Sequence, residues 1–194
     1  IGDYAFEGCS SLTQIAIPSS VTKIGKGAFR SCSLFTQIVI PFSVTIINDN
    51  VFSEYSSLTQ ITIPSSLTSI GDGVSRKCSS LAQITIPSSV TKIGKEAFYE
   101  CSLLEQISVP SAVTKIEDHS FCGCSSLKEI TIPSSVISIG NGAFKNCSSL
   151  TQITIPSSVT SFGTNIFSGV KILEIKGDIQ NIPKNLFSGC SSLT

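Results

Sequence analysis

The chain has 194 residues, of which 41% are hydrophobic and 13% charged, and 13 basic side chains balance 13 acidic ones. A net charge of zero lacks the basic excess that binding to nucleic acid or to an anionic membrane surface requires. The small charged fraction and the absence of Met and Trp are unusual for an enzyme domain and favour a repetitive β-rich scaffold. No apolar run approaches the roughly 20 residues of a membrane-spanning helix, so we expect no membrane insertion in this segment.

A period of 23 residues runs through the chain. Such self-similarity is typical of a solenoid, in which each repeat contacts only its neighbours. About eight units fit, and the sequence begins and stops inside a unit. We therefore expect a single domain over residues 1–194 that is a fragment of a longer array. Cysteine marks one position of the unit, and Tyr55 fills the vacant place in the series Cys9, Cys32, Cys78, Cys101, Cys124 and Cys147.

Each unit opens with a short predicted strand. In the segment SLTQITIP, residues 57–64, the apolar residues follow the spacing L-x-x-I-x-I. The final alternation predicts that Ile61 and Ile63 point inward while Gln60 and Thr62 point outward. β-Branched residues favour a strand, and Pro64 ends it by removing a ladder donor.

A second extended piece and a turn complete the unit. Residues 67–70 form the second piece, and Gly71 closes it with a residue that tolerates a positive φ. In the following segment, Ala97, Phe98 and Cys101 exemplify the pattern GxxAFxxC. This pattern predicts a short helical or 3₁₀ turn with those three residues on one side.

A single unit buries too little apolar surface to fold alone, so neighbouring coils must cover one another. We expect an α/β solenoid dominated by one long parallel β-sheet, with short strands and 3₁₀ or helical turns on the other side. An inner column of the sheet would contain Ile15, Ile38, Ile61, Ile84, Ile107, Ile130, Ile153 and Leu173. A second column, interrupted only by Ser75, would contain Phe6, Phe29, Phe52, Phe98, Phe121, Phe144, Phe167 and Phe187. Next to Val170 the residues Cys-Ser-Ser of the turn are missing, and the alignment there places Glu174 in the rank of Thr154.

The unit L-x-x-I-x-I-P-x-x-V-x-x-I-G-x-x-A-F-x-x-C, complete at residues 81–101, resembles the BspA-like class of leucine-rich repeats over nearly the whole chain. The resemblance implies a right-handed leucine-rich-repeat solenoid on the surface of oral or gut bacteria or mucosal protozoa. It also implies adhesion to host matrix proteins or to other cells. This chain departs from the pattern at Glu117 for glycine, Ser75 for phenylalanine, Tyr55 for cysteine, and throughout residues 170–187.

Cysteines are the first candidates for chemistry. Seven of the eight, Cys190 included, fall at the inward position, where stacked thiols have no preferred disulfide partner and pack as small hydrophobic groups. We expect a column of free thiols. Cys122 lies outside it and is a candidate for reactivity or pairing, or alternatively a solvent-facing turn residue.

His119 is the only histidine and lies near Glu117, Asp118, Cys122 and Cys124. These residues do not have the spacing of a zinc site, and a Cys–His pair alone lacks the further groups that nucleophilic catalysis needs. We expect no enzyme, no metal and no cofactor. Asn146-Cys147-Ser148 matches the glycosylation sequon, and its use stays open.

The outward strand positions are the candidate protein-binding surface. An uncharged hydrogen-bonding face on a rigid sheet suits protein recognition, and a solvated face without a partner is the alternative. The predicted residues are Gln37, Val39, Phe42, Gln60, Thr62, Gln83, Thr85, Gln106, Ser108, Glu129 and Thr131. Val39 and Phe42, with Tyr55 nearby, replace polar residues and predict an exposed apolar patch, unless they reflect drift in a degenerate repeat.

We expect a secreted or cell-surface module that binds proteins, such as host matrix or cell-surface proteins. The alternative is an intracellular leucine-rich-repeat scaffold, which unpaired thiols favour. Uncapped apolar surfaces at Ile1–Phe6 and around Leu186–Leu193 predict end-to-end self-association.

Overall fold

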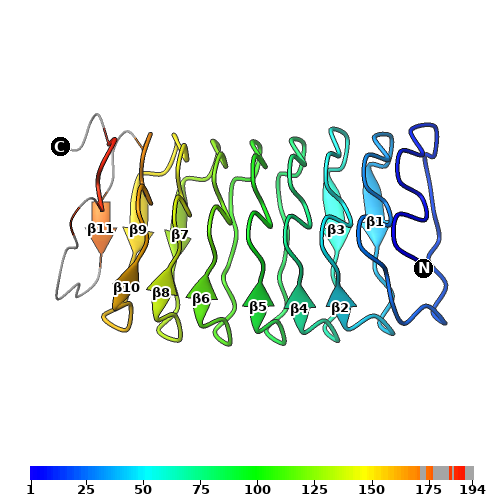
Figure 1. The fold of residues 1–194 in the computed structure, drawn as a ribbon, viewed down its shortest axis with the longest axis horizontal. Helices are drawn as coiled ribbons and strands as arrows, with labels where there is room; N and C mark the ends of the chain where they lie inside the picture. Colours follow the sequence, from blue (N-terminus) through cyan, green and yellow to red (C-terminus); the bar gives the residue numbers. More distant parts are fainter. Residues whose placement is uncertain (171–173, 177–183, 185, 191–194) are drawn as a thin grey trace.

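The computed structural model describes residues 1–170, 174–176, 184 and 186–190. Coils stack along one axis into a straight rod, and the strands of successive coils run parallel (Figure 1). Two rows of strands follow the rod and point in opposite directions in Figure 1. The chain is therefore a parallel β-solenoid.

The first wall of the rod is built from the Q-I-T segments. Its strands are β1 (Gln37–Val39), β3 (Gln60–Thr62), β7 (Glu129–Thr131), β9 (Gln152–Thr154) and β11 (Glu174–Lys176). β1 pairs with β3, and β7, β9 and β11 form a second sheet. In β1, β3 and β7 the middle isoleucine is buried and both flanking residues are exposed, as the alternating pattern predicts.

The second wall is built from the short extended pieces before each glycine. Its strands are β2 (Ile46–Ile47), β4 (Ser69–Ile70), β5 (Lys92–Ile93), β6 (Lys115–Ile116), β8 (Ser138–Ile139) and β10 (Ser161–Phe162). They form the sheets β2-β4-β5 and β6-β8-β10. The long sheet expected on the first wall is divided into shorter sheets, whereas the short strands expected beside it form the second wall. Strands of the first wall span three residues, because the Pro-Ser-Ser corner then turns the chain.

The third side consists of turns, and no helix occurs in the described residues. The helical or 3₁₀ turns expected in the GxxAFxxC segment are therefore not found. Each such segment has residues with positive φ, as at His119 (φ 54°) and Gly123 (φ 78°), and these interrupt the negative φ values that a helix needs. The segment instead bonds to the next coil: His119 N–H donates to Asn141 O at 2.9 Å, and Phe121 N–H donates to Ala143 O at 3.0 Å.

The predicted phenylalanine column is present in the core. Ring centroids are 5.3 and 6.2 Å apart from Phe6 through Phe29 to Phe52. They are 5.5–5.9 Å apart along the second stretch, which contains Phe98, Phe121, Phe144, Phe167 and Phe187. Ser75 interrupts the column and is fully buried.

The isoleucine column is also present, but its last predicted member is wrong. Ile175, not Leu173, lies opposite Ile153, and Glu174 lies opposite Gln152. Leu173 itself lies outside the described residues. Paired residues of β9 and β11 are 22 positions apart in the sequence, whereas those of β7 and β9 are 23 apart. Of the three residues missing from the irregular unit, one is therefore missing before β11 and the other two after it.

Side-chain ladders at the corners join successive coils. Asp49 Oδ1 accepts the N–H of Asp72, and Asp72 Oδ1 accepts the N–H of Lys95, both at 2.9 Å. Lysine has no acceptor, so Lys95 instead pairs through Nζ with Asp118 Oδ2 at 3.5 Å. At the Pro-Ser-Ser corner, hydroxyls such as that of Ser158 donate to a carbonyl 22 residues earlier, at 2.8 Å. These bonds fix the shape of the walls that carry the candidate surface.

Candidate protein-binding surface

The structure places the predicted outward residues in two exposed ranks on the first wall, and we call this surface the Gln/Thr wall. One rank contains Gln37, Gln60, Gln83, Gln106 and Glu129, and the other contains Val39, Thr62, Thr85, Ser108 and Thr131. Backbone register aligns the ranks, since Gln37 lies opposite Gln60 and Val39 lies opposite Thr62. The wall therefore presents repeated hydrogen-bonding groups on a fixed backbone.

The backbone ladder of the Gln/Thr wall is interrupted at two seams within the described residues. β3 forms no ladder with residues 83–85, and β7 forms none with residues 106–108. A single parallel bridge joins Gln83 to Gln106 between these seams. At each seam, strand N–H and C=O groups face the neighbouring coil without a ladder partner.

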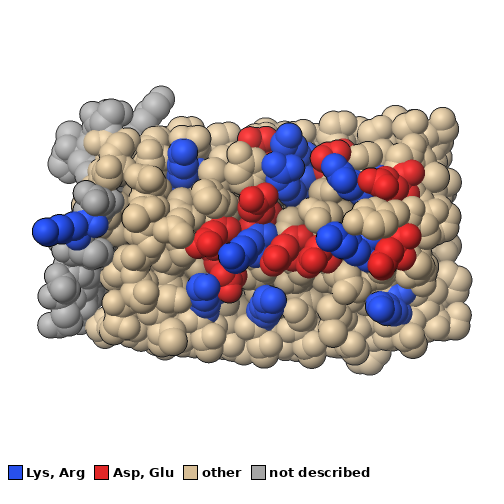
Figure 2. Space-filling model, viewed as in Figure 1, with Lys and Arg blue, Asp and Glu red and all other residues tan. Residues whose placement is uncertain are grey.

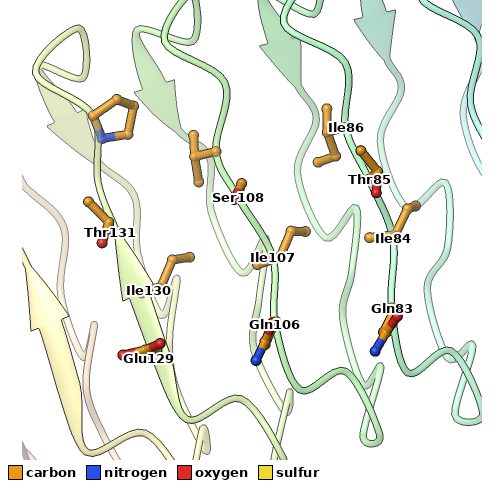
Figure 3. Close-up of a pocket in the computed structure, with 12 residues that line it drawn as sticks. Gln83, Ile84, Thr85, Ile86, Gln106, Ile107, Ser108, Glu129, Ile130 and Thr131 are labelled. Atoms are coloured by element: carbon orange, nitrogen blue, oxygen red, sulfur yellow. The ribbon is translucent and has the colours of Figure 1, made fainter.

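Each seam opens into a shallow groove. The central groove, lined by residues of 83–86, 106–109 and 129–133, has a volume of about 590 Å³ (Figure 3). The β3 groove, lined by residues of 59–63 and 82–85, has a volume of about 460 Å³. Figure 3 shows the side chains of Gln83, Gln106 and Glu129 along one edge of the central groove and Thr85, Ser108 and Thr131 along another.

The grooves combine an apolar floor with a polar rim. Ile84 and Ile107 form part of the floor and are 8% and 7% exposed, against 0% for Ile153, where the ladder is intact. Glutamine amides can both donate and accept hydrogen bonds, as can the hydroxyl groups of the other rank. This arrangement can hydrogen-bond to peptide groups while covering apolar side chains, but it supplies no activated nucleophile.

The predicted apolar patch contains Val39 and Phe42, which are 63% and 70% exposed, but not Tyr55. Tyr55 is fully buried, because its ring stacks on Phe35 at 6.1 Å inside the rod. Sequence reasoning missed two further exposed apolar residues of the same coil, Leu34 and Ile46. Their signal was available, since each replaces a residue that is polar in most other units.

The cysteines are free, as the stacking argument predicts. In the column, Sγ donates to a backbone carbonyl of the preceding coil, as from Cys78 to Phe52 O at 2.9 Å. Burial raises the pKa of the Cys78 thiol to about 12. Two members of the column are not fully buried: Cys9 is exposed, because its coil has a neighbour on one side only in this structure, and Cys190 is half-buried.

The structure places Cys122 in the core and His119 against the next coil. Cys122 is 5% exposed, so the expectation of a solvent-facing turn residue is wrong, and burial raises its pKa. His119 is half-buried and packs over Gly142 of the next coil. No group of three or more His, Cys, Asp or Glu side chains in the described residues is placed to hold a metal ion.

Charged side chains concentrate on the turn side, in the GxxAFxxC segments, and form pairs between coils. Acidic and basic groups are interleaved along the rod in Figure 2. Arg30 lies between Glu7 and Glu54, at 3.5 and 2.9 Å, and Arg76 pairs with Glu96 at 2.9 Å. The Gln/Thr wall is uncharged except at Glu129, so its recognition chemistry is that of neutral donors and acceptors.

No helix in the described part of the chain has the length and apolar character that crossing a bilayer requires.

Solved structures of bacterial leucine-rich-repeat proteins resemble this chain over all or most of its length. A leucine-rich repeat protein from Bacteroides ovatus is 32% identical, with a TM-score of 0.78 over 100% of this chain and 57% of that one. The T. pallidum leucine rich repeat protein is 32% identical, with a TM-score of 0.68 over 87% of this chain and 68% of that one. A leucine rich cell surface protein from Faecalibacterium prausnitzii is 29% identical, with a TM-score of 0.57 over 100% of this chain and 67% of that one.

The chain thus spans little more than half the length of the Bacteroides ovatus protein. No curated protein matches it. The BspA type leucine rich repeat region matches in six copies over residues 1–105 and 75–194. Together with the stacked coils and their repeated columns, this match shows that the chain belongs to the BspA-type leucine-rich-repeat family.

Proposed function

We propose that this chain is a non-enzymatic adhesion module of a cell-surface or secreted protein, and that it binds protein partners through the Gln/Thr wall. The observation that carries the proposal is the alignment of two ranks of exposed residues on one face, with Gln37 opposite Gln60 and Gln83 opposite Gln106. Rigid repeated surfaces of this kind suit extended protein contacts. Leucine-rich repeats as a family support a role in protein–protein interaction.

The chemistry of the wall favours protein over other partners. Its amides and hydroxyls match peptide groups, and the grooves offer apolar floor beneath them. Val39 and Phe42 add exposed apolar area at one end of the wall, which suits a contact of high local affinity. The balanced charge of the chain gives no electrostatic attraction to a nucleic acid.

Two observations bear on the location. The Faecalibacterium prausnitzii relative is described as a cell surface protein, which supports an extracellular position for this chain. Eight free thiols favour the alternative of an intracellular scaffold, because exported proteins commonly pair their cysteines. Burial of most of these thiols weakens that argument, since a buried column is protected from oxidants in either compartment.

A binding assay against immobilised extracellular-matrix proteins and host-cell extracts tests the wall. We expect Thr85→Lys and Val39→Lys each to weaken binding by about tenfold, because a lysine ammonium in a covered contact loses hydration without a partner. Thr114→Lys, at an exposed position beside β6 on the second wall, is the matched control and should bind normally. Full binding by both wall variants would exclude this face as the site.

Antibody staining of intact and permeabilised cells tests the location. Surface staining of intact cells supports the adhesion module, and staining only after permeabilisation supports the intracellular scaffold.

We also propose self-association through the ends of the rod. Ile1, Phe6 and Leu12 of the first coil are half-buried, and Phe187 near the other end is half-buried as well. Residues 191–194 lie outside the described part of the chain. Sedimentation velocity across a concentration series should show growing oligomers, and a constant monomer would contradict this contact.

A further inference from the structure

A glycine follows the second-wall strand in most coils and lies tightly against the preceding coil. A Cβ on Gly94 would lie 2.5 Å from the carbonyl carbon of Gly71, and a Cβ on Gly140 would lie 2.6 Å from a backbone nitrogen of the coil before it. This close approach lets Gly94 N–H donate to Ile70 O at 3.0 Å and Gly140 N–H donate to Ile116 O at 2.8 Å. A residue with a side chain at this position therefore holds the two coils apart.

Asn48 and Glu117 replace the glycine, and they differ in how the lost hydrogen bond is compensated. The side chain of Asn48 donates from Nδ2 to Ile24 O at 2.5 Å, in place of the backbone donor. A carboxylate has no donor, so Glu117 cannot do the same. Among the hydrogen bonds of the described residues, none reaches Ile93 O from Glu117.

Other bonds are missing at the same junction, between β5 and β6, which lie side by side in the lower row of strands in Figure 1. These two strands form no ladder. Thr114 N–H makes no bond to Thr91 O, although the next coil forms the equivalent bond to Thr114 O at 2.9 Å. Lys95 offers no acceptor to the N–H of Asp118, and an ion pair at 3.5 Å joins these two side chains instead. We call this gap in the second wall the β5–β6 seam.

The turn side stays joined at this junction. Its backbone hydrogen bonds are 2.7–3.0 Å long, as in the donation from Phe98 N–H to Ser120 O, and the rings of Phe98 and Phe121 stack at 5.7 Å. The first wall is joined less firmly, by the single bridge between Gln83 and Gln106. The two coils are thus held along one side and can separate along another.

We propose that the β5–β6 seam is a hinge in the middle of the rod, and that the Cβ of Glu117 creates it. The second wall opens and closes between residues 92–95 and 115–118, with the turn side as the pivot. The central groove lies on the first wall at the same junction, so this motion changes the curvature of the Gln/Thr wall between Gln83 and Gln106. The hinge operates whatever the wall binds.

The energetic reason is that opening the seam breaks few interactions. The neighbouring junctions of the second wall, β4 with β5 and β6 with β8, have paired strands and a glycine N–H bond that must be broken before the coils part. At the seam, an ion pair between partly exposed side chains takes their place, and such pairs contribute little. Local opening concentrates where the fewest backbone hydrogen bonds hold a structure closed.

Amide hydrogen exchange measured by NMR tests the seam. We expect the N–H groups of Thr114 and Glu117 to exchange about a hundredfold faster than their counterparts in the next coil, Ile137 and Gly140. Glu117→Gly should restore the bond to Ile93 O and slow the exchange of Thr114 by about tenfold or more. The matched control Glu117→Ala removes the same carboxylate but keeps the Cβ, so Thr114 should exchange as fast as in the parent.

Distances between two spin labels, measured by pulsed EPR, test whether the rod bends. Labels at Thr45→Cys and Thr160→Cys, both at exposed positions of the second wall, lie on either side of the seam. Cys9→Ser and Cys190→Ser remove the two column thiols that are not fully buried. We expect a broad distance distribution in this background, a narrower one after Glu117→Gly, and an unchanged one after Glu117→Ala.

A further variant, Gly140→Ala, should create a second seam one coil later, because its Cβ would meet Asp118 N at 2.6 Å. The N–H of Ile137 should then exchange about tenfold faster or more. If this variant does not fold, the two Glu117 variants decide alone. Equal exchange at Thr114 and Ile137 in the parent, equal behaviour of Glu117→Gly and Glu117→Ala, or unchanged exchange of Ile137 in Gly140→Ala would overturn the hinge.

These measurements involve no binding partner, so they are independent of the proposed function. Normal binding by Thr85→Lys and Val39→Lys would overturn the Gln/Thr wall as the binding site and leave the hinge in place. A uniformly protected second wall would overturn the hinge and leave the binding surface in place.

Discussion

The imidazole of His119 covers Gly142 of the next coil so closely that a Cβ on Gly142 would lie 2.8 Å from Nε2 and Cδ2. Tyr4 covers Gly27 in the same way, 23 residues apart, with ring atoms at 2.6 Å from the added Cβ. In these two pairs, an aromatic ring of one coil packs against a glycine at the same position of the next coil. The single histidine thus packs closely against a glycine of the next coil.

Replacing Gly142 by alanine should destabilise the rod. Gly142 has φ 56°, a left-handed conformation that costs a residue with a Cβ about 1–2 kcal/mol, and the contact with His119 adds to that cost. Urea unfolding measures the loss. Gly2→Ala, whose Cβ would meet nothing within 4 Å, is the control. The double variant with His119→Ala should recover the contact cost only, and an unchanged unfolding midpoint for Gly142→Ala would contradict this account.

Tyr55→Phe should stabilise the chain, which is the opposite of the usual result in a core. The Tyr55 hydroxyl is buried, and the Cys32 thiol beside it is only a weak hydrogen-bond acceptor that lies outside normal hydrogen-bond geometry. A buried hydroxyl without a good partner costs about 1–3 kcal/mol. The phenyl ring retains the contacts with Phe35 and Phe52. We expect a gain of about 1 kcal/mol in the free energy of unfolding. Tyr4→Phe at an exposed position should change little, and a loss of stability in Tyr55→Phe would show that the hydroxyl has a partner.

Thiol labelling should follow burial. Cys9 is exposed and should react first with iodoacetamide in the folded protein. Cys78, Cys101 and Cys122 are buried, and burial raises the pKa of each thiol, so that little thiolate is present at neutral pH. Peptide mapping after timed labelling reads out each site. Early modification of Cys122 would restore it as a reactive candidate.

Acid should weaken the contact between Arg30 and Glu54. The hydrogen bonds from Arg30 and Ser31 hold the pKa of Glu54 below its ordinary value of 4.5. A carboxylate with a lowered pKa stabilises the fold above its unfolded pKa, and this contribution is lost as pH falls through the lower folded value. Both partners are about one-third exposed, so we expect an effect below about 1 kcal/mol.

Urea midpoints from pH 7 down to about pH 3 test this dependence. In Glu54→Gln, the urea midpoint should fall less steeply as the pH is lowered below the ordinary pKa of a carboxyl group. Added salt should reduce the difference between the parent and Glu54→Gln, because it screens the ion pair. Identical plots of urea midpoint against pH for the parent and Glu54→Gln would show that the Arg30–Glu54 pair does not contribute to the pH dependence of stability.

Sequence alone predicted the repeat, the inward and outward positions and the columns of isoleucine and phenylalanine, because each depends on a residue type that recurs at a fixed interval. The turn geometry was not predictable in this way. Positive φ occurs at residues as different as Glu96 and His119, so the residue types of the turn do not indicate which backbone positions have positive φ. The burial of Cys122 was missed because the turn bonds to the next coil rather than folding into a local helix.

Exceptions to the pattern were harder to interpret than the pattern itself. Tyr55 and Ser75 were recognised as departures, but their consequences depend on neighbours in other coils. The tyrosine ring stacks on Phe35, and the serine leaves a cavity between Phe52 and Phe98. In the candidate surface, the two ranks were predictable by counting, whereas the interrupted ladder and its grooves arise from the spacing of strands in three dimensions.

Many backbone hydrogen bonds of this rod join residues one coil apart, as in the donation from Phe121 N–H to Ala143 O. Deletion of one whole repeat therefore brings together two coils whose facing surfaces still match. Repeats can be added to or lost from the gene in this way without other changes to the core. The length of the rod can then change while the residues of the Gln/Thr wall stay the same.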